Sequence, residues 1–215
     1  MDNKDKILSN AISVFAEKGL HGAKMEEIAA KSGCNKAMIY YYFSSKENLF
    51  SETLVWIVMG IFGEMLEMEQ GIFESNEMTP PEKLRRFISI QIEVFGKQME
   101  YSRLFNYALG HEPDRVSEAV ETAFKRGGFM GPECIFNVFD EGVRDGWFKK
   151  FDYAHALINI IAMGLIHVIA KPISEVIIGR KVENELEFRK DREASIIDVI
   201  FNGILARPAD SPKTV

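Results

Sequence analysis

The segment GAKMEEIAAKSGCNKAMIYYYFSSKENLF, residues 22–50, contains the pattern that determines the fold of the N-terminal part of this chain. Apolar residues at helical spacing predict two short helices, at about 25–32 and 36–42, and Gly33 between them permits a tight turn. Asn35 belongs to the residue types that most often cap a helix N-terminus. Two short helices joined by a glycine-containing turn form a helix-turn-helix, and the second helix of such a pair enters the major groove of DNA.

The residues around this segment fit the same arrangement. A helix at about 4–18 carries one apolar stripe and ends at Gly19, and a long helix is expected to begin at Lys46. The side chains expected to pack onto that stripe are Ile28, Ala29, Ile39 and Phe43. The other face of the second short helix is thereby left for contact with a partner.

Several blocks in this order and spacing resemble the TetR family of bacterial regulators: Ile28-Ala29, Gly33-Cys34-Asn35, Ile39-Tyr40-Tyr41-Tyr42-Phe43 and Ser45-Lys46-Glu47-Asn48-Leu49. The resemblance covers about residues 4–55. It implies an all-helical protein of about nine helices, with an N-terminal three-helix DNA-binding domain and a C-terminal domain for ligand binding and dimerisation. It also implies a homodimer that a ligand releases from operator DNA.

The resemblance assigns DNA contacts to individual positions. Lys36 and Ala37 lie where the family meets bases, and the tyrosines that follow match positions that contact phosphate or bases, although packing is the alternative for them. Lys46 matches a lysine at a helix start, where the positive helix end and the ammonium together suit a phosphate. The family often has Thr or Ser before the helix at 25–32, where this chain has Ala23 and Lys24. The predicted DNA-binding residues are Lys24, Asn35, Lys36, Ala37, Tyr40, Tyr41 and Lys46.

The charge distribution agrees with an N-terminal contact surface. The chain has a formal net charge of −6, but its first fifty residues carry seven lysines against six acidic residues. That segment therefore nets +1, and the remainder is acidic. Phosphates repel an acidic body, so the N-terminal segment is left as the surface that DNA can approach.

The rest of the chain is predicted to be helical, with breaks at Gly, Pro, Asn and Asp residues. Helices are expected at about 80–98, 101–109, 114–125, 133–144, 152–170 and 189–206, with a loop between the last two. The fold class is therefore all-α. The predicted domains are a helix-turn-helix domain at 1–48, a ligand-binding and dimerisation domain at 49–208, and a flexible tail at 209–215.

The last two predicted helices are the candidates for a dimer interface. Their apolar residues cover a wide arc, and small residues in the first of them allow close approach of a partner. The alternative is that both are core helices of a monomer. The residues predicted to form the interface are Ala156, Ile160, Met163, Ile197, Ile200, Phe201 and Ile204.

The middle of the chain is rich in phenylalanine and methionine, which predicts an apolar pocket. We therefore expect a small hydrophobic effector, such as a lipid-like or aromatic molecule, although these residues also suit a simple core. The candidate ligand-binding residues are Phe87, Phe105, Asn106, Tyr107, Phe136 and His167.

Other classes of protein find little support. Motifs of metalloproteases, nucleotide-binding loops, hydrolases and dinucleotide-binding enzymes are absent from the sequence, and its two cysteines and four histidines lack zinc spacing. We therefore expect neither catalytic residues, nor a cofactor, nor a metal. The apolar stretch at 154–170 is short for a membrane span, and no signal-peptide pattern opens the sequence, so a cytoplasmic protein without membrane contact is expected. The predicted function is a ligand-released repressor. An activator or a ligand-independent regulator of the same fold is the alternative.

Overall fold

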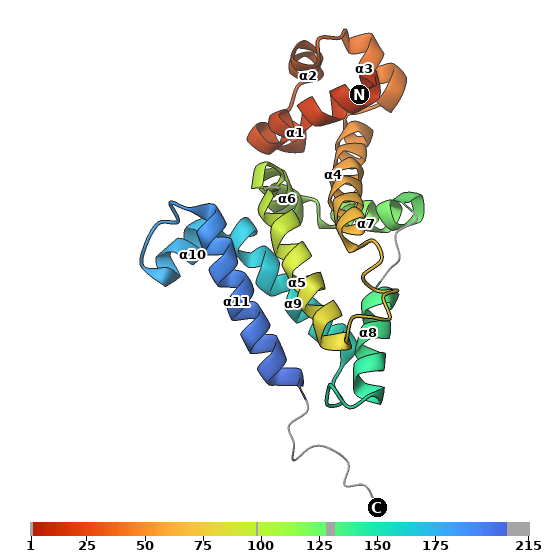
Figure 1. Cartoon of the computed structure of the whole chain (residues 1–215). Helices are drawn as coiled ribbons and strands as arrows, with labels where there is room; N and C mark the ends of the chain where they lie inside the picture. The colour runs from red at the N-terminus through yellow and green to blue at the C-terminus, as the bar shows by residue number, and fades with distance from the viewer. Residues whose placement is uncertain (1, 98, 128–131, 206–215) are drawn as a thin grey trace, which may run out of the picture. The chain divides into compact units, whose positions relative to one another are not determined.

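The computed structural model describes residues 2–97, 99–127 and 132–205, and these form eleven α-helices (Figure 1). The all-α prediction is confirmed, but the expected count of about nine is too low. The helices are α1 Asn3–Gly22, α2 Met25–Ser32, α3 Lys36–Phe43, α4 Lys46–Glu69, α5 Pro80–Lys97, α6 Met99–His111, α7 Pro113–Gly127, α8 Glu133–Arg144, α9 Tyr153–Ile169, α10 Lys171–Ile178 and α11 Glu185–Ile204.

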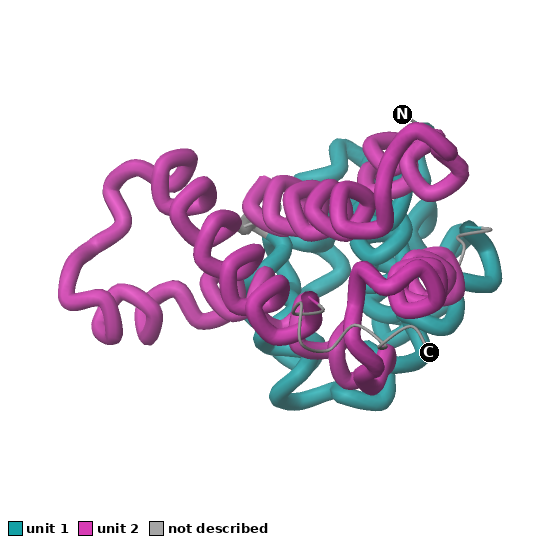
Figure 2. Tube along the Cα trace, turned by 60° about the horizontal axis from the view of Figure 1, so that its bottom comes forward, with its two compact units in different colours: residues 1–63, 98–129 teal, residues 64–97, 130–215 magenta. Residues whose placement is uncertain are grey.

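The chain divides into two compact units, and each of them is assembled from two separate stretches of sequence (Figure 2). Unit 1 contains residues 1–63 and 98–129, and unit 2 contains residues 64–97 and 130–215. The division differs from the predicted boundary at residue 48, because α4 continues through that boundary and α6 and α7 return to unit 1. The predicted tail at 209–215 lies outside the described residues.

The core of unit 1 combines the helix-turn-helix with helices that are distant in sequence. The rings of Phe15 and Phe50 meet edge to face, with 5.0 Å between their centroids. Leu104 and Ala108 of α6 are fully buried in the same apolar cluster as Ile28 and the other core residues of α1 to α4. The helix-turn-helix is therefore held by packing of α1 against both α2 and α6.

Gly19 bends α1 near its end, where the sequence predicts that this helix stops. Its φ of 67° and ψ of 178° are non-helical and lie in a region that is essentially restricted to glycine. A Cβ atom at this position would lie 2.5 Å from the ring of Tyr107 on α6. The glycine therefore permits both the bend and the close contact between α1 and α6.

Unit 2 is built around α5, which packs against α8, α9 and α11. Its core contains Leu84, Phe87, Phe139 and Ile160, among other buried residues. The side chain of Lys83 is also buried, and its Nζ lies 3.1 Å from Oε2 of Glu141 on α8. This ion pair is the means by which the core accommodates a charged group.

The segment after α9 differs from the expected loop. It contains α10, which begins with Pro172 in its first turn and is bent by 93° from α9. Proline cannot donate the hydrogen bond that would continue α9, so the chain turns and starts a new helix. The last helix begins at Glu185 rather than near residue 189, because Asn184 caps it by accepting from the backbone N–H of Glu187 at 3.2 Å.

The residues predicted for the dimer interface differ in how deeply they are buried within a single chain. Ile160, Ile200, Phe201 and Ile204 are buried in the core of unit 2, because their faces of α9 and α11 turn toward this chain's own helices. Within a single chain they therefore contribute to the core of unit 2. The other predicted residues, Ala156, Met163 and Ile197, are partly buried against the same core. The large apolar residues that α9, α10 and α11 do expose are Ile158, Ile166, Ile173, Val176, Ile177, Ile178, Leu186 and Val199.

By length and composition, α4 could span a membrane, and the bent pair of α9 and α10 passes the same test if the two count as one span. In α4, however, Phe50, Leu54 and Ile57 are fully buried within unit 1. Core helices of proteins without membrane spans have the same composition.

Candidate nucleic-acid interface

The turn between α2 and α3 has the geometry that its sequence predicts. Gly33 adopts a left-handed conformation with φ of 63°, and its N–H donates to the carbonyls of Ala29 and Ala30. The side chain of Asn35 caps α3 by accepting from the N–H of Met38 at 2.8 Å. Ile39 and Phe43 are fully buried, so they fix the rotation of α3 about its axis.

The opposite face of α3 is open to solvent. Lys36 and Ala37 are exposed, and Tyr40 and Tyr41 expose 41% and 83% of their surface. An aromatic side chain as exposed as Tyr41 adds little to the stability of the fold, which leaves it available for a partner. The structure thus brings the base-contact candidates together on one face of one rigid helix.

Lys36 is held by two neighbours on this surface. Its Nζ donates to Oε1 of Glu26 on α2 at 2.5 Å, and lies 5.6 Å from the centre of the Tyr40 ring. The hydrogen bond from Lys36 lowers the pKa of Glu26, and the same bond raises the pKa of Lys36. Sequence reasoning missed Glu26, because residues ten apart on different helices meet only once the turn is formed.

Lys24 precedes α2 and is exposed, and its side chain makes no capping hydrogen bond. The first turn of α2 therefore lacks the cap that Ser or Thr would supply at this position. Ala23 beside it is buried, which explains why a small apolar residue stands there. Lys24 remains available for a phosphate, as the sequence predicts.

Lys46 has a role within the protein that the sequence did not predict. Its Nζ donates to the backbone carbonyls of His21 at 3.0 Å and of Ala23 at 3.1 Å. These carbonyls lie at the end of α1, where the helix dipole favours a positive charge. The lysine at the start of α4 thereby ties α4 to the junction of α1 and α2, and one of its three N–H donors is left for a phosphate.

Replacement of Lys46 by alanine is expected to destabilise unit 1 by about 1–2 kcal/mol, because two charge-assisted hydrogen bonds to backbone carbonyls are lost at a half-exposed site. The measurement is the urea midpoint followed by fluorescence of Trp56, in a Trp147→Phe background. Lys125→Ala, which removes an exposed lysine of α7, is the control and should leave the midpoint unchanged. An unchanged midpoint for Lys46→Ala would show that this ammonium is not a structural link in solution.

The candidate ligand-binding residues do not form one group. Phe105, Asn106 and Tyr107 belong to α6 in unit 1, where the two aromatic residues pack against the core that supports the helix-turn-helix. Phe87 and Phe136 contribute to the core of unit 2. The six candidates are thus divided between the two units, and their contact with a ligand stays a prediction.

His167 of unit 2 is buried and makes internal contacts. Its Nε2 lies 3.2 Å from Oε2 of Glu185, and its ring lies 4.2 Å from that of Phe188. Glu185 also accepts a hydrogen bond from Lys171. These contacts join α9, α10 and α11, so His167 acts here as a structural residue.

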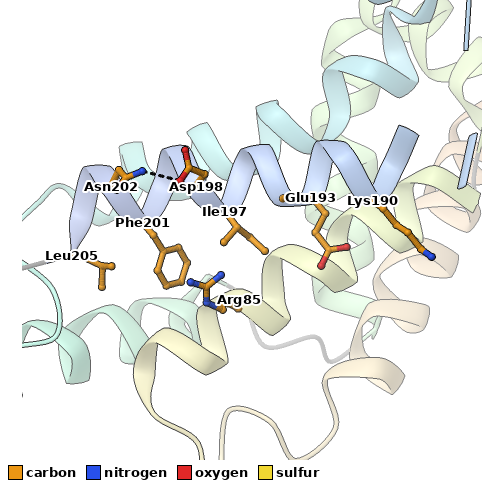
Figure 3. A pocket seen from close by; sticks show the side chains of 9 residues that line it. Arg85, Lys190, Glu193, Ile197, Asp198, Phe201, Asn202 and Leu205 are labelled. Carbon is orange, nitrogen blue, oxygen red and sulfur yellow. Dashed lines mark hydrogen bonds between the residues drawn. The ribbon is translucent and has the colours of Figure 1, made fainter. Parts of the chain in front are cut away.

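Unit 2 carries an open groove of about 620 Å³ between α5 and α11 (Figure 3). Arg85 lies over the ring of Phe201 inside it, with 4.3 Å between the guanidinium carbon and the ring centre. The groove is lined by Arg85, Lys190, Glu193, Ala194, Ile197, Asp198, Phe201, Asn202 and Leu205. It combines an apolar floor with charges of both signs, and two of the residues predicted for the dimer interface lie in it.

Glu69, at the end of α4 in unit 2, is an unusual carboxylate. Its Oε1 is shielded from solvent and has no hydrogen-bond partner among the described residues. Burial raises the pKa of Glu69 to about 7. The folded state therefore binds this proton more tightly than the unfolded chain does, so unfolding becomes easier as the pH rises from about 4.5 to about 7.

Glu69→Gln is expected to remove this pH dependence and to stabilise unit 2 at pH 8 by about 1–2 kcal/mol, once the shift is reduced for the solvent screening of a partly buried group. The measurement compares urea midpoints at pH 5 and pH 8 for the variant and the natural sequence. Glu67→Gln removes an exposed carboxylate of the same helix and is the control. Equal gains from Glu69→Gln at both pH values would contradict the assignment.

Among the described residues, no group of three or more His, Cys, Asp or Glu side chains has the arrangement of a metal site.

Comparison with known proteins agrees with this geometry. Residues 7–53 match the family model described as bacterial regulatory proteins, tetR family. This segment of the chain is therefore a TetR-type domain. The matched region contains α2, α3 and the exposed face of α3, so the TetR-type domain coincides with the candidate nucleic-acid interface.

Two curated relatives are transcriptional regulators. IcaR of Staphylococcus aureus, a negative regulator of a biofilm operon, is 41% identical over 51 residues, which cover 24% of this chain and 27% of IcaR. RutR of Escherichia coli is 30% identical over 102 residues, which cover 47% of this chain and 45% of RutR. The aligned part thus spans less than half the length of either relative.

Solved structures show the same fold over nearly the whole chain. FadR of Bacillus subtilis, solved in complex with stearoyl-CoA, has a TM-score of 0.68 and 22% sequence identity, and the match covers 93% of this chain and 98% of FadR. The fold shared with FadR therefore includes unit 2.

Proposed function

We propose that this TetR-family chain is a homodimeric repressor that binds a near-palindromic operator and is released by a small hydrophobic effector. The observation that carries the DNA-binding part is the exposed face of α3, on which Lys36, Ala37, Tyr40 and Tyr41 share one side of a helix anchored by buried residues. The name of IcaR as a negative regulator favours repression over activation.

Dimerisation would give each operator two recognition helices about 34–36 Å apart, which is one turn of DNA. The exposed apolar residues of α9 and α11, among them Ile158, Ile166 and Val199, supply a surface that a second copy would cover. The first fifty residues carry a net charge of only +1, so a single helix-turn-helix domain has a weak general attraction for phosphates. Strong binding to the operator is then expected to require both helix-turn-helix domains of the dimer.

A hydrophobic effector is supported by the aromatic side chains of unit 2. Phe139, Phe151 and Tyr153 pack with centroid separations of 5.1 to 5.6 Å, and Phe136 lies beside them. The complex of FadR with stearoyl-CoA shows that a related fold accommodates a long apolar chain. Phe87 and Phe136 are the proposed ligand contacts that remain from the sequence prediction.

The helix α4 offers a route from effector to DNA. It begins at Lys46, which ties it to α1 and α2, and ends at Glu69 in unit 2, about 36 Å away at 1.5 Å per residue. An effector that binds more tightly when α4 is tilted would shift the population of dimers toward that conformation. The two α3 helices would then no longer have the spacing that fits DNA. Such a protein would act in the cytoplasm, where its operator is.

The first test is a gel shift at low salt on the intergenic DNA beside the chain's own coding region. Lys36→Ala is expected to weaken binding and relax sequence preference, whereas Lys125→Ala should change neither. Absence of any shift, on this fragment and on a library of random duplexes, would overturn the DNA-binding proposal. Binding that persists without an effector but increases transcription of the adjacent gene would favour the alternative of an activator.

The second test is native mass spectrometry of the purified dimer. A co-purifying lipid or aromatic molecule is the expected result. A bound charged metabolite would overturn the proposed class of effector and leave the DNA-binding proposal intact.

A further inference from the structure

The ion pair between Glu26 and Lys36 lies on the surface that the proposed function assigns to DNA. The two side chains come from α2 and α3, the two helices of the helix-turn-helix, and their charged atoms are 2.5 Å apart. The side chain of Glu26 is 63% exposed and that of Lys36 is 46% exposed. An exposed pair of this kind adds little to stability, so the fold does not need it.

A glutamate at this position has an electrostatic disadvantage. DNA phosphates repel it, and it neutralises the lysine that would otherwise attract them. A second pair in the same unit shows the contrast. Glu27 and Lys18 are also 2.5 Å apart, but one oxygen of Glu27 is shielded from solvent, and this pair joins α2 to α1 rather than to α3.

The donor and acceptor of the Glu26 and Lys36 pair match the major-groove edge of a G·C base pair. The ammonium is a donor and the carboxylate an adjacent acceptor. In the major groove, guanine presents the acceptors O6 and N7, and its cytosine partner presents the N4 donor beside them. Lysine is suited to the guanine atoms, and glutamate to the N4 group of cytosine. The ring of Tyr40 near Lys36 helps to keep the ammonium at this position.

We propose that Glu26 and Lys36 together read one G·C base pair in each half-site, with Lys36 donating to guanine and Glu26 accepting from N4 of cytosine. This inference rests on the proposed DNA-binding function. It makes Glu26 a specificity-determining residue of the TetR-type domain, although glutamate lowers the general affinity for DNA.

The experiment uses the full chain and a library of random-sequence duplexes, with sequencing of the bound fraction at fixed salt. Glu26→Ala and Lys36→Ala are each expected to relax preference for G·C at the same base pair of each half-site, by about 5- to 150-fold. Glu26→Ala is also expected to strengthen binding to random DNA. The double variant should relax that base pair no further than Lys36→Ala alone.

Glu27→Ala is the matched control, because it removes a paired glutamate from the same helix. It should leave the base preference unchanged, and circular dichroism melts would show that all variants are folded. A Glu26→Ala variant that binds every sequence more tightly but keeps the base preference would overturn the proposal. It would mean that Glu26 only repels the DNA phosphates. Relaxation at different base pairs in the two single variants would also overturn it. If the natural sequence selects no site from the library, the proposed function fails instead.

Discussion

Replacing Gly19 by alanine is expected to lower the free energy of unfolding of unit 1 by about 3–5 kcal/mol, from backbone strain and steric overlap together. The backbone at Gly19 has φ of 67° and ψ of 178°, a conformation that residues with a Cβ atom rarely adopt. The added Cβ would lie 2.5 Å from Cε2 and Cζ of Tyr107, in a ring that packs against Phe50. Neither α1 nor α6 can move away without disturbing the same core.

The measurement is the urea midpoint of Trp56 fluorescence in a Trp147→Phe background, together with DNA binding. Gly60→Ala is the control, because Gly60 is a helical residue of α4 with no atom within 4 Å of the position of its added Cβ. That control should stabilise the helix by up to about 1 kcal/mol. If Gly19→Ala unfolds at the midpoint of the natural sequence, the bend at residue 19 is not needed for the packing of α1 against α6.

Removing the carboxylate of Glu141 is expected to destabilise unit 2 by about 3 kcal/mol, because Glu141→Ala leaves a buried ammonium without its partner. The side chain of Lys83 is 6% exposed and lies in the core beside Leu84. Lys83→Met should be neutral or stabilising, since it removes the charge and keeps the volume. Substitutions of the two residues of this ion pair are thus expected to change the free energy of unfolding by very different amounts.

Urea denaturation followed through Trp147, in a Trp56→Phe background, measures both variants. Glu121→Ala, in the exposed pair with Lys125, is a control that removes a paired glutamate at the surface. Similar losses for Lys83→Met and Glu141→Ala would contradict the argument, because they would mean that attraction within the pair exceeds the desolvation of Lys83.

The helix-turn-helix could be predicted from the sequence because its determinants are local. Gly33 ends one helix and Asn35 caps the next, and the apolar spacing orients both. These signals act within a few residues and need no knowledge of the rest of the fold. The exposed face of α3 follows from them directly.

The faces of α9 and α11 could not be predicted in the same way. Apolar residues cover a wide arc of both helices, and periodicity does not say which part of the arc meets the chain's own core. The sequence predicts Ile160 and Ile200 for the dimer interface, and both are buried in the core of unit 2. Val199, beside Ile200, is exposed instead.

Contacts between segments that are distant in the chain also could not be predicted from the sequence. Tyr107 is predicted as a ligand contact from its residue type, whereas its close approach to Gly19 depends on the return of α6 to unit 1. Lys46 is predicted to contact phosphate, whereas its bonds to His21 and Ala23 depend on how α1 ends. In each case the partner is set by chain topology rather than by neighbouring residues.

The discontinuity of unit 1 limits how such regulators can be recombined. Exchange of the first fifty residues between two family members looks like a modular way to retarget a regulator to new promoters. In this chain, however, Leu104, Ala108, Val116 and Ala119 of α6 and α7 are buried in the same core as the helix-turn-helix. A chimera that joins the foreign head at residue 50 would place two unrelated half-cores against each other. Retargeting by grafting only the solvent-facing residues of α2 and α3 preserves that core.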